Sequence, residues 1–216
     1  MSETSTLIGA EHFQYIAERT TREDEFLREL KRAAIAENIP SIWIAPEQAS
    51  FMQILLRAAK ARDVVEVGTL AGYSTIWMAR ALPEGGRVRT IELEKKHADF
   101  AERWVAKSDV AGRVEVSRGP AAEVLKGFAA DSADAAFLDA DKPNYPRYLA
   151  ECLRIVRRGG LIMVDNAFAF GELFDRGTAR EDVAAMRAFN DRMAKTAELQ
   201  SVMVPLGDGL WVGVKR

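Results

Sequence analysis

Three oxygen-bearing side chains stand directly after two short apolar segments in the second half of the chain. Asp139 follows AAFL, and Asp165 and Asn166 follow LIMV. If both segments are parallel strands, these side chains gather at the carboxyl edge of one sheet, where doubly wound sheets bind ligands. Carboxylate and amide oxygens, without cysteine or histidine, suit a hard divalent cation such as Mg²⁺, with Mn²⁺ or Ca²⁺ as alternatives. A single Asp here would be as well explained as a turn or helix cap, but the three together predict a metal site.

Lys142 lies three residues after Asp139, in the segment DADKPNY. Close to a divalent cation an ammonium group is disfavoured, and the neutral amine that remains is the form that acts as a general base. Without a metal nearby, an ordinary exposed lysine is an equally good interpretation. The role of Lys142 as catalytic base therefore depends on the metal site.

A second group of candidates surrounds the segment VVEVGTLAGYS, residues 64–74, in which an apolar run is interrupted by Gly68 and Gly72. This pattern predicts a buried strand that turns sharply into a helix. Glu92 lies 24 residues after Gly68, at the end of the next predicted strand. A carboxylate at that position accepts the two hydroxyls of a ribose in dinucleotide-binding folds. A solvated acid at a strand end is the alternative.

The same turn is poorly suited to a pyrophosphate. Residues 64–74 contain neither G-x-G-x-x-G nor a basic side chain, whereas Ser74 and the amides at the start of the following helix suit a carboxylate. A nucleoside with an amino-acid end and a positive charge fits better. S-adenosylmethionine (SAM) has these groups, and its sulfonium is compatible with acidic neighbours.

Carboxylates accumulate at the predicted strand ends. They are Glu66, Glu92, Glu94, Asp139, Asp141 and Asp165. Like charges at one sheet edge repel one another unless a cation or hydrogen-bond donors are bound there. This repulsion is a physical reason to expect a ligand site at this edge.

Elements that bring these residues together alternate along the chain. Helices are predicted over about 10–18, 20–37, 46–61, 74–82, 95–108, 121–129, 143–156 and 183–196, and strands over 64–68, 86–94, 113–119, 134–141, 160–166 and twice within 201–216. Thr20 or Thr21 is expected to cap the second helix, Gly159-Gly160 to end the helix 143–156, and Asp208-Gly209 to turn the last hairpin. The alternation predicts an α/β fold with a doubly wound, mostly parallel sheet, helices on both faces and a C-terminal antiparallel hairpin.

Length and composition exclude several other classes. A chain of 216 residues suits a single domain, 1–216, with residues 1–45 as a helical appendage. The formal net charge of -2 does not favour nucleic-acid binding. No apolar run reaches membrane-spanning length, and the N-terminus lacks the pattern of a signal peptide. The one cysteine, Cys152, fits a reducing cytosol, so we expect a cytoplasmic protein without a membrane partner.

Taken together, these motifs resemble a known family over nearly the whole chain, from APEQ (45–48) to GDGL (207–210). The chain is similar to the cation-dependent, SAM-dependent O-methyltransferases of the caffeoyl-CoA and catechol type. The resemblance rests on VEVGTLAGYS, the acid in TIELE, GPA (119–121), FLDADKPNY and VDN (164–166). It implies a seven-stranded sheet of the Rossmann-like methyltransferase fold.

The resemblance also implies a role for each matching residue. Cofactor contacts would be made by Ile44, Glu66, Gly68, Thr69, Ser74, Glu92, Ala121 and Asp141. The metal would be held by Asp139, Asp165 and Asn166. Lys142 would be the base, and the acceptor would touch Ile42, Trp43, Asp139, Lys142 and Asn166.

The implied acceptor is a vicinal dihydroxyaryl small molecule that chelates the metal through both oxygens. Ile42-Trp43 and the apolar segment AFAFGELF, residues 167–174, differ from what relatives commonly carry, and both are expected near the acceptor. Relatives are commonly homodimers, and the N-terminal helices with AFAFGELF would supply the interface. Two alternatives stay open from the sequence: a nucleotide-linked oxidoreductase on the same fold, and a non-catalytic SAM-binding protein.

Overall fold

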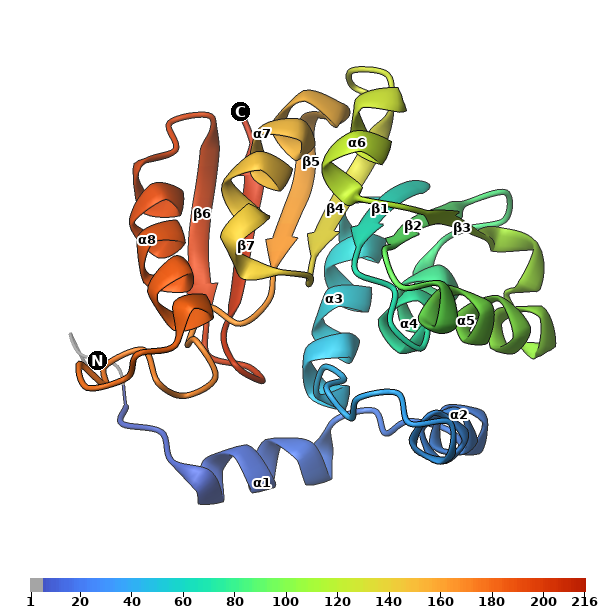
Figure 1. Cartoon of the computed structure of the whole chain (residues 1–216), viewed down its shortest axis with the longest axis horizontal. Helices are drawn as coiled ribbons and strands as arrows, with labels where there is room; N and C mark the ends of the chain where they lie inside the picture. Colours follow the sequence, from blue (N-terminus) through green and yellow to red (C-terminus); the bar gives the residue numbers. More distant parts are fainter. Residues whose placement is uncertain (1–5) are drawn as a thin grey trace.

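The computed structural model describes residues 6–216, so the first five residues of the predicted N-terminal segment lie outside it. Its seven strands form one sheet in the order β3-β2-β1-β4-β5-β7-β6 (Figure 1). The strands are β1 Asp63–Val67, β2 Arg87–Glu92, β3 Val114–Arg118, β4 Ala133–Leu138, β5 Val156–Val164, β6 Leu199–Val204 and β7 Leu210–Lys215. β1 to β5 pair in parallel, and β7 runs antiparallel to both β5 and β6. The predicted mostly parallel sheet with a C-terminal antiparallel hairpin is confirmed.

Helices cover both faces of this sheet. They are α1 Ala10–Arg19, α2 Glu25–Ala36, α3 Pro46–Ala58, α4 Tyr73–Ala81, α5 Lys95–Lys107, α6 Ala121–Val124, α7 Tyr145–Ile155 and α8 Glu181–Lys195, with short 3₁₀ turns at Ala111–Arg113, Leu125–Gly127 and Lys142–Asn144. Successive residues of a strand point to opposite faces, so Val64 of β1 packs with α2 to α5, and Val65 and Val67 pack with α6 to α8. α1 has no buried residue and lies away from the sheet (Figure 1). Within residues 6–216, no helix has the length and apolar character needed to cross a membrane.

The predicted site residues are placed by the hydrogen-bond ladder of the sheet itself. The first residue after β1, β3, β4 and β5 still donates its backbone N–H to the neighbouring strand. These bonds are Gly68 N to Ile91 O (3.0 Å), Gly119 N to Glu92 O (2.9 Å), Asp139 N to Val67 O (2.9 Å) and Asp165 N to Leu138 O (3.0 Å). These four positions are therefore fixed to the sheet by its own hydrogen bonds.

Gly68 is required at its position for two reasons. Its φ of +99° lies in the left-handed region, which strains residues with a side chain. A Cβ would also lie 2.0 Å from the carbonyl oxygen of Asp139, which is far inside contact distance. The glycine thus allows the ends of β1 and β4 to approach each other, in addition to opening the turn toward a ligand.

The predicted start of the second helix was wrong. α2 begins at Glu25, and Asp24 is its N-cap, with a side-chain oxygen accepting from the Leu27 N–H at 3.0 Å. Thr20 is instead the C-cap of α1, with an extended backbone and a hydroxyl that donates to the carbonyl of Ile16 at 2.9 Å. Thr20, Thr21 and Asp24 are all good N-cap residue types, and only the packing of the α2 apolar face selects among them.

Gly159 and Gly160 also have a different role from the predicted one. The preceding helix, α7, ends at Ile155, and both glycines belong to β5, which begins at Val156. A Cβ on Gly160 would lie 2.6 Å from the Asp134 carbonyl oxygen, at the irregular start of the β4–β5 pairing. Gly160 therefore permits the close approach of β4 and β5, whereas Gly159 is in the left-handed region with a φ of +75°. The remaining predicted elements are present with bounds that differ by a few residues.

Candidate active site

One cavity of about 1060 Å³ opens at the carboxyl edge of the central strands. With one exception, Glu66, every residue that the sequence singled out for cofactor, metal, base or acceptor lines this cavity. These residues are Ile42, Trp43, Ile44, Gly68, Thr69, Ser74, Glu92, Ala121, Asp139, Asp141, Lys142, Asp165 and Asn166. The structure brings them together, although their individual roles stay predictions.

Glu92 is held in a fixed orientation at the end of β2. Its two carboxylate oxygens accept backbone N–H groups, one from Leu70 at 2.7 Å and one from Glu94 at 2.9 Å. His97 of α5 places Nδ1 3.6 Å from the same carboxylate and also lines the cavity. A carboxylate fixed in this way keeps lone pairs free for hydroxyl donors of a ligand.

Glu66 lies behind the cavity wall and is joined to it through the cavity-lining residue Ser74. The Ser74 hydroxyl donates to one carboxylate oxygen at 2.5 Å, and the Thr75 hydroxyl donates to the other. The side chain is completely buried, and this burial raises the pKa of Glu66 to about 7 in spite of the hydroxyl donors. Ser74 lines the cavity, so Glu66 determines which way the Ser74 hydroxyl points.

Glu66 should make the free protein less stable as the pH rises. Between the ordinary pKa of 4.5 and about 7, the folded state keeps a proton that the unfolded chain releases, so the free energy of unfolding falls across this range. Glu66→Gln should remove this fall, which is on the order of 2 kcal/mol between pH 5 and pH 8. Urea unfolding at both pH values measures it. Glu115→Gln, an exposed site on β3, is the matched control, and equal pH dependence in both variants would contradict the assignment.

Two carboxylates meet on the other side of the cavity. Asp165 is buried, and one of its oxygens accepts from the Gln48 side chain at 2.7 Å. Burial and the negative charge of Asp139 hold the pKa of Asp165 well above its usual range. Asp139 in turn is 3.2 Å from the ammonium of Lys142. This pair of carboxylates carries an electrostatic cost that a bound cation would relieve.

Asn166 completes the group as a neutral ligand. Its backbone is in the left-handed region at φ 62°, and its amide nitrogen donates to Asp208 at 3.1 Å, which leaves the carbonyl oxygen free. Among residues 6–216, no three or more His, Cys, Asp or Glu side chains are grouped so that they could hold a metal. The predicted site is of another composition, with two carboxylates and one amide. These oxygen donors fit a hard divalent cation.

Lys142 is buried beside this group. Its Nζ donates to the Tyr145 hydroxyl at 2.7 Å as well as to Asp139, and it lies 5.8 Å from the ring of Phe170. Tyr145 is fully buried, which raises the pKa of its phenol and keeps it neutral. The amine is therefore held at the cavity wall by two polar partners, close to an aromatic ring.

The mouth of the cavity is bordered by two segments that are distant in sequence. Ile42 and Trp43 come from the segment before α3, and the Trp43 ring lies 6.5 Å from that of Tyr73. The Tyr73 hydroxyl donates to Glu23 at 2.8 Å, which joins the α1–α2 connection to the start of α4. This contact links the N-terminal helical segment to the ligand cavity.

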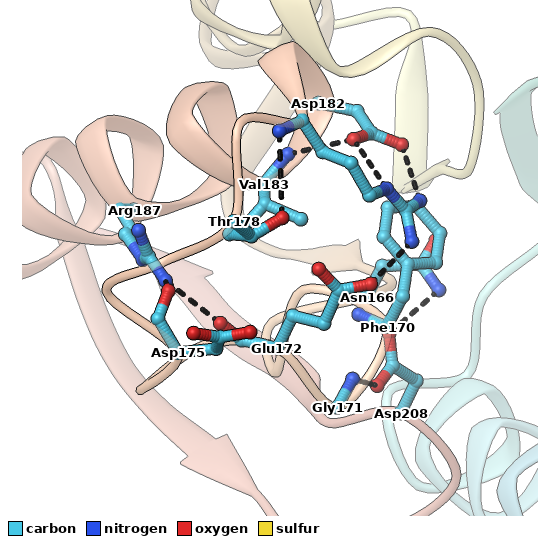
Figure 2. Close-up of polar contacts among 11 residues, drawn as sticks. Asn166, Phe170, Gly171, Glu172, Asp175, Thr178, Asp182, Val183, Arg187 and Asp208 are labelled. Atoms are coloured by element: carbon cyan, nitrogen blue, oxygen red, sulfur yellow. Dashed lines mark hydrogen bonds and ion pairs between the residues drawn. The ribbon is translucent and has the colours of Figure 1, made fainter.

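Phe170, which also lines the cavity, belongs to the loop of residues 167–180 that precedes α8; Figure 2 shows the polar contacts of this loop. Arg180 forms ion pairs with Glu172 at 2.6 Å and Asp182 at 2.7 Å, and its guanidinium lies 4.6 Å from the Phe170 ring. Arg187 of α8 donates to backbone carbonyls of the loop, including that of Leu173 at 2.8 Å. Although irregular, the loop is fixed by side chains rather than free.

Four residues of this site were missed by reasoning from the sequence: Gln48, His97, Phe170 and Asp208. His97 was assigned to an ordinary amphipathic helix, because periodicity shows a helix face but not what that face meets. Asp208 was recognised only as a turn residue. Gln48 had a usable signal, since a polar side chain inside the apolar stripe of a predicted helix needs a buried partner.

The fold and the cavity define a protein class. The sheet has the strand order β3-β2-β1-β4-β5-β7-β6, and its last hairpin is antiparallel. Glu92, at the end of β2, is placed to accept the hydroxyls of a ribose. This combination is typical of Rossmann-like methyltransferases. The family model described as O-methyltransferase matches residues 17–216. The chain belongs to the O-methyltransferase family.

Individual relatives agree with this assignment. The chain is 34% identical over 205 residues to a catechol O-methyltransferase from Niastella koreensis, which covers 94% of this chain and 90% of the relative. The solved structure of the O-methyltransferase from Bacillus cereus in complex with S-adenosylhomocysteine (SAH) is 33% identical in sequence and has a TM-score of 0.86. The match covers 95% of this chain and 97% of that chain. The O-methyltransferase TomG from Streptomyces achromogenes in complex with SAM is 31% identical with a TM-score of 0.82, over 95% and 96% of the two chains.

Proposed function

We propose that this protein transfers a methyl group from SAM to one hydroxyl of a vicinal dihydroxyaryl small molecule, with the help of a divalent cation. The observation that carries the proposal is the juxtaposition in one cavity of Asp139, Asp165, Asn166 and Lys142 with the fixed carboxylate of Glu92. Asp139, Asp165 and Asn166 suit a metal ion to which a diol can bind, and Lys142 suits removal of the proton from that diol. Glu92 suits the ribose of a nucleoside. Family membership supports methyl transfer to oxygen.

The donor half of the cavity fits SAM, whose sulfonium supplies an electrophilic methyl group. Glu92 would accept the ribose hydroxyls, and Ser74, directed by Glu66, would bind the amino-acid end. Ile44, Gly68, Thr69, Ala121 and Asp141 complete this half. Structural relatives in complex with SAH and with SAM support the choice of donor.

The acceptor half fits a divalent cation, Mg²⁺ or alternatively Mn²⁺ or Ca²⁺. When bound, such a cation would lower the pKa of a chelated phenol and fix the acceptor oxygens. The carboxylates of Asp139 and Asp165 and the amide oxygen of Asn166 would hold it. The raised pKa of Asp165 supports this. It shows that burial and the charge of Asp139 disfavour the ionised form of Asp165, and a bound cation would stabilise that form.

Lys142 would take the proton from the acceptor oxygen that receives the methyl group. The amine is buried, so water competes little for it, and Tyr145 and Asp139 fix its position. The resulting oxyanion would attack the sulfonium methyl carbon in line, so that the O–C bond forms as the C–S bond breaks, the methyl carbon is inverted and S-adenosylhomocysteine leaves. Ile42, Trp43 and Phe170 would flank the acceptor ring, with the N-terminal segment 1–45 forming one border of this half.

Methyl transfer over a panel of catechols, caffeoyl esters and flavonoids, with Mg²⁺ or with EDTA, tests the proposal. Methylation of at least one diol with Mg²⁺, and its loss in EDTA, is the expected result. Undiminished activity in EDTA would exclude the metal role. Binding of SAM and metal without turnover of any diol would favour a non-catalytic protein. Tighter binding of NAD than of SAM would favour the oxidoreductase alternative.

We also propose a homodimer, with the interface formed by the N-terminal helices and residues 167–174. Two observations support it: α1 buries no residue within its own chain, and Phe174 is 89% exposed in that segment. A large apolar side chain at such exposure is usually covered by a partner when it lies in a wider apolar patch. A monomeric mass by light scattering would reject the dimer.

A further inference from the structure

Asp208 lies in the turn that joins β6 to β7, and its carboxylate faces the end of β5 and the 167–180 loop. One oxygen accepts from the Asn166 amide at 3.1 Å and from the backbone N–H of Phe170 at 2.7 Å. The other oxygen accepts from the backbone N–H of Gly171 at 3.1 Å. Figure 2 shows the carboxylate between these three donors. The proposed reaction uses the side chains of Asn166 and Phe170 from this group but assigns no role to Asp208.

The charge of Asp208 determines which end of the Asn166 amide faces the cavity. A carboxylate can only accept hydrogen bonds, so it binds the NH₂ end of the amide and never the carbonyl end. The carbonyl oxygen of Asn166 is thereby turned away from Asp208. That oxygen is the only atom of the amide that can ligate a hard cation.

The same carboxylate stabilises a strained backbone. Asn166, Ala169 and Phe170 all have positive φ, at 62°, 53° and 61°, and each such residue costs about 1–2 kcal/mol. The Ala169 N–H donates to the backbone carbonyl of Asn166 at 2.8 Å, which closes this turn. Successive backbone N–H groups in such a turn form a concave site for an anion, and Asp208 fills it.

Gly207, next to Asp208 in the same turn, lies against the side chain that donates to Asp165, another proposed metal ligand. Gly207 has a φ of +56°, and a Cβ on it would lie 2.0 Å from the side-chain oxygen of Gln48. Gln48 donates to Asp165 at 2.7 Å. The β6–β7 turn therefore contacts the surroundings of both Asp165 and Asn166.

We infer that Asp208 is a positioning residue that presents the Asn166 carbonyl oxygen to the metal and at the same time holds Phe170 beside Lys142. The Asp208 carboxylate thus fixes both a proposed metal ligand, Asn166, and an aromatic residue proposed to contact the acceptor, Phe170. The inference rests on the proposed function, because it assigns Asp208 to the proposed metal site.

The test is Asp208→Asn in the full chain, with Asp175→Asn as the matched control. Asp175 lies in the same loop, but within residues 6–216 its carboxylate accepts a single hydrogen bond, from the Gly177 N–H at 2.8 Å. Mn²⁺ binding is measured by electron paramagnetic resonance in the presence of S-adenosylhomocysteine, together with the dissociation constant of S-adenosylhomocysteine itself. Residues that orient metal ligands typically contribute 10–100-fold to affinity, so Asp208→Asn should weaken Mn²⁺ binding by that factor. Asp175→Asn should leave it unchanged, and both variants should bind S-adenosylhomocysteine as the wild type does.

Hydrogen exchange of the Phe170 and Gly171 amides is a second measurement that does not depend on metal. Both amides should exchange faster in Asp208→Asn and not in Asp175→Asn. Unchanged Mn²⁺ affinity in Asp208→Asn, with a wild type that binds Mn²⁺, would overturn the inference and leave the proposed function intact. A wild type that binds no Mn²⁺ would overturn the metal part of the proposed function, and the role of Asp208 with it. Equal weakening of Mn²⁺ and S-adenosylhomocysteine binding would show general damage to the cavity and also contradict the inference.

Discussion

Asp165→Asn is expected to reduce methylation of a diol acceptor by on the order of 10²–10³-fold while cofactor binding is retained. The substitution keeps the shape of the side chain and an oxygen that can accept from Gln48, and it removes one of the two carboxylates proposed to hold the cation. A metal ion contributes several kcal/mol to transition-state stabilisation, and each 1.4 kcal/mol corresponds to a factor of ten in rate. Initial rates at saturating SAM, with Mg²⁺ titrated, measure the loss.

The same variant should be more stable than the wild type in the absence of metal above neutral pH. The cause is the proximity of Asp139, whose negative charge, with burial, keeps the pKa of Asp165 raised. An acid with a raised folded-state pKa destabilises the fold as pH rises through that range, and a neutral amide does not. Lower activity combined with higher stability is difficult to attribute to misfolding, so the two measurements together separate a functional role from a structural one.

Asp134→Asn provides the opposite control. Asp134 lies at the other end of β4, where its carboxylate accepts the backbone N–H of Arg62 at 2.7 Å and pairs with Arg157 at 2.6 Å. Against the opposing effect of burial, the backbone N–H of Asp63 together with these two partners lowers the pKa of Asp134, so the charged form supports the fold. Its replacement should lower the unfolding temperature with little change in the rate per folded molecule. If Asp165→Asn behaved in the same way, Asp165 would be a structural residue.

The mostly parallel pairing of the sheet and its terminal hairpin could be predicted from the sequence because their determinants are local. Apolar runs such as that from Val64 to Val67 define buried strands, and parallel pairing then requires their ends to meet at one edge. Asp139 and Asp165, each directly after such a run, could be placed together without any tertiary information. Their backbone N–H groups extend the ladder, which explains why simple strand-end reasoning placed them well.

Residues that approach the site from the outside could not be predicted in this way. His97 and Asp208 reach the cavity from a helix face and from a hairpin turn, and neither direction is encoded by hydrophobic periodicity. Gly159 and Gly160 show the same limit. Two consecutive glycines are typical of a helix end, but Gly160 is required by the close approach of β4 to β5, which is a contact between distant segments.

Lys142→Met is expected to lower kcat for an ordinary catechol by about 10²–10⁴-fold, the range for loss of a general base. Methionine keeps much of the length and apolar stem of lysine but has no amine. Binding of S-adenosylhomocysteine should be unchanged, since Lys142 contacts Asp139, Tyr145 and Phe170 rather than the Glu92 side of the cavity. Lys107→Met, at an exposed site over the Trp104 ring, is the matched control.

The acidity of the acceptor distinguishes proton removal from a purely electrostatic role for Lys142. A nitrocatechol ionises far more readily than catechol, so its oxygen needs little help to lose the proton. If Lys142 is the base, the loss of kcat in Lys142→Met should be much smaller for the nitrocatechol, and raising the pH should restore part of the rate for catechol. Equal losses for both acceptors at every pH would mean that the ammonium acts by orienting Asp139 and the acceptor. The base would then have to be sought elsewhere in the cavity, because a proton still has to leave the oxygen before or as it attacks the methyl group.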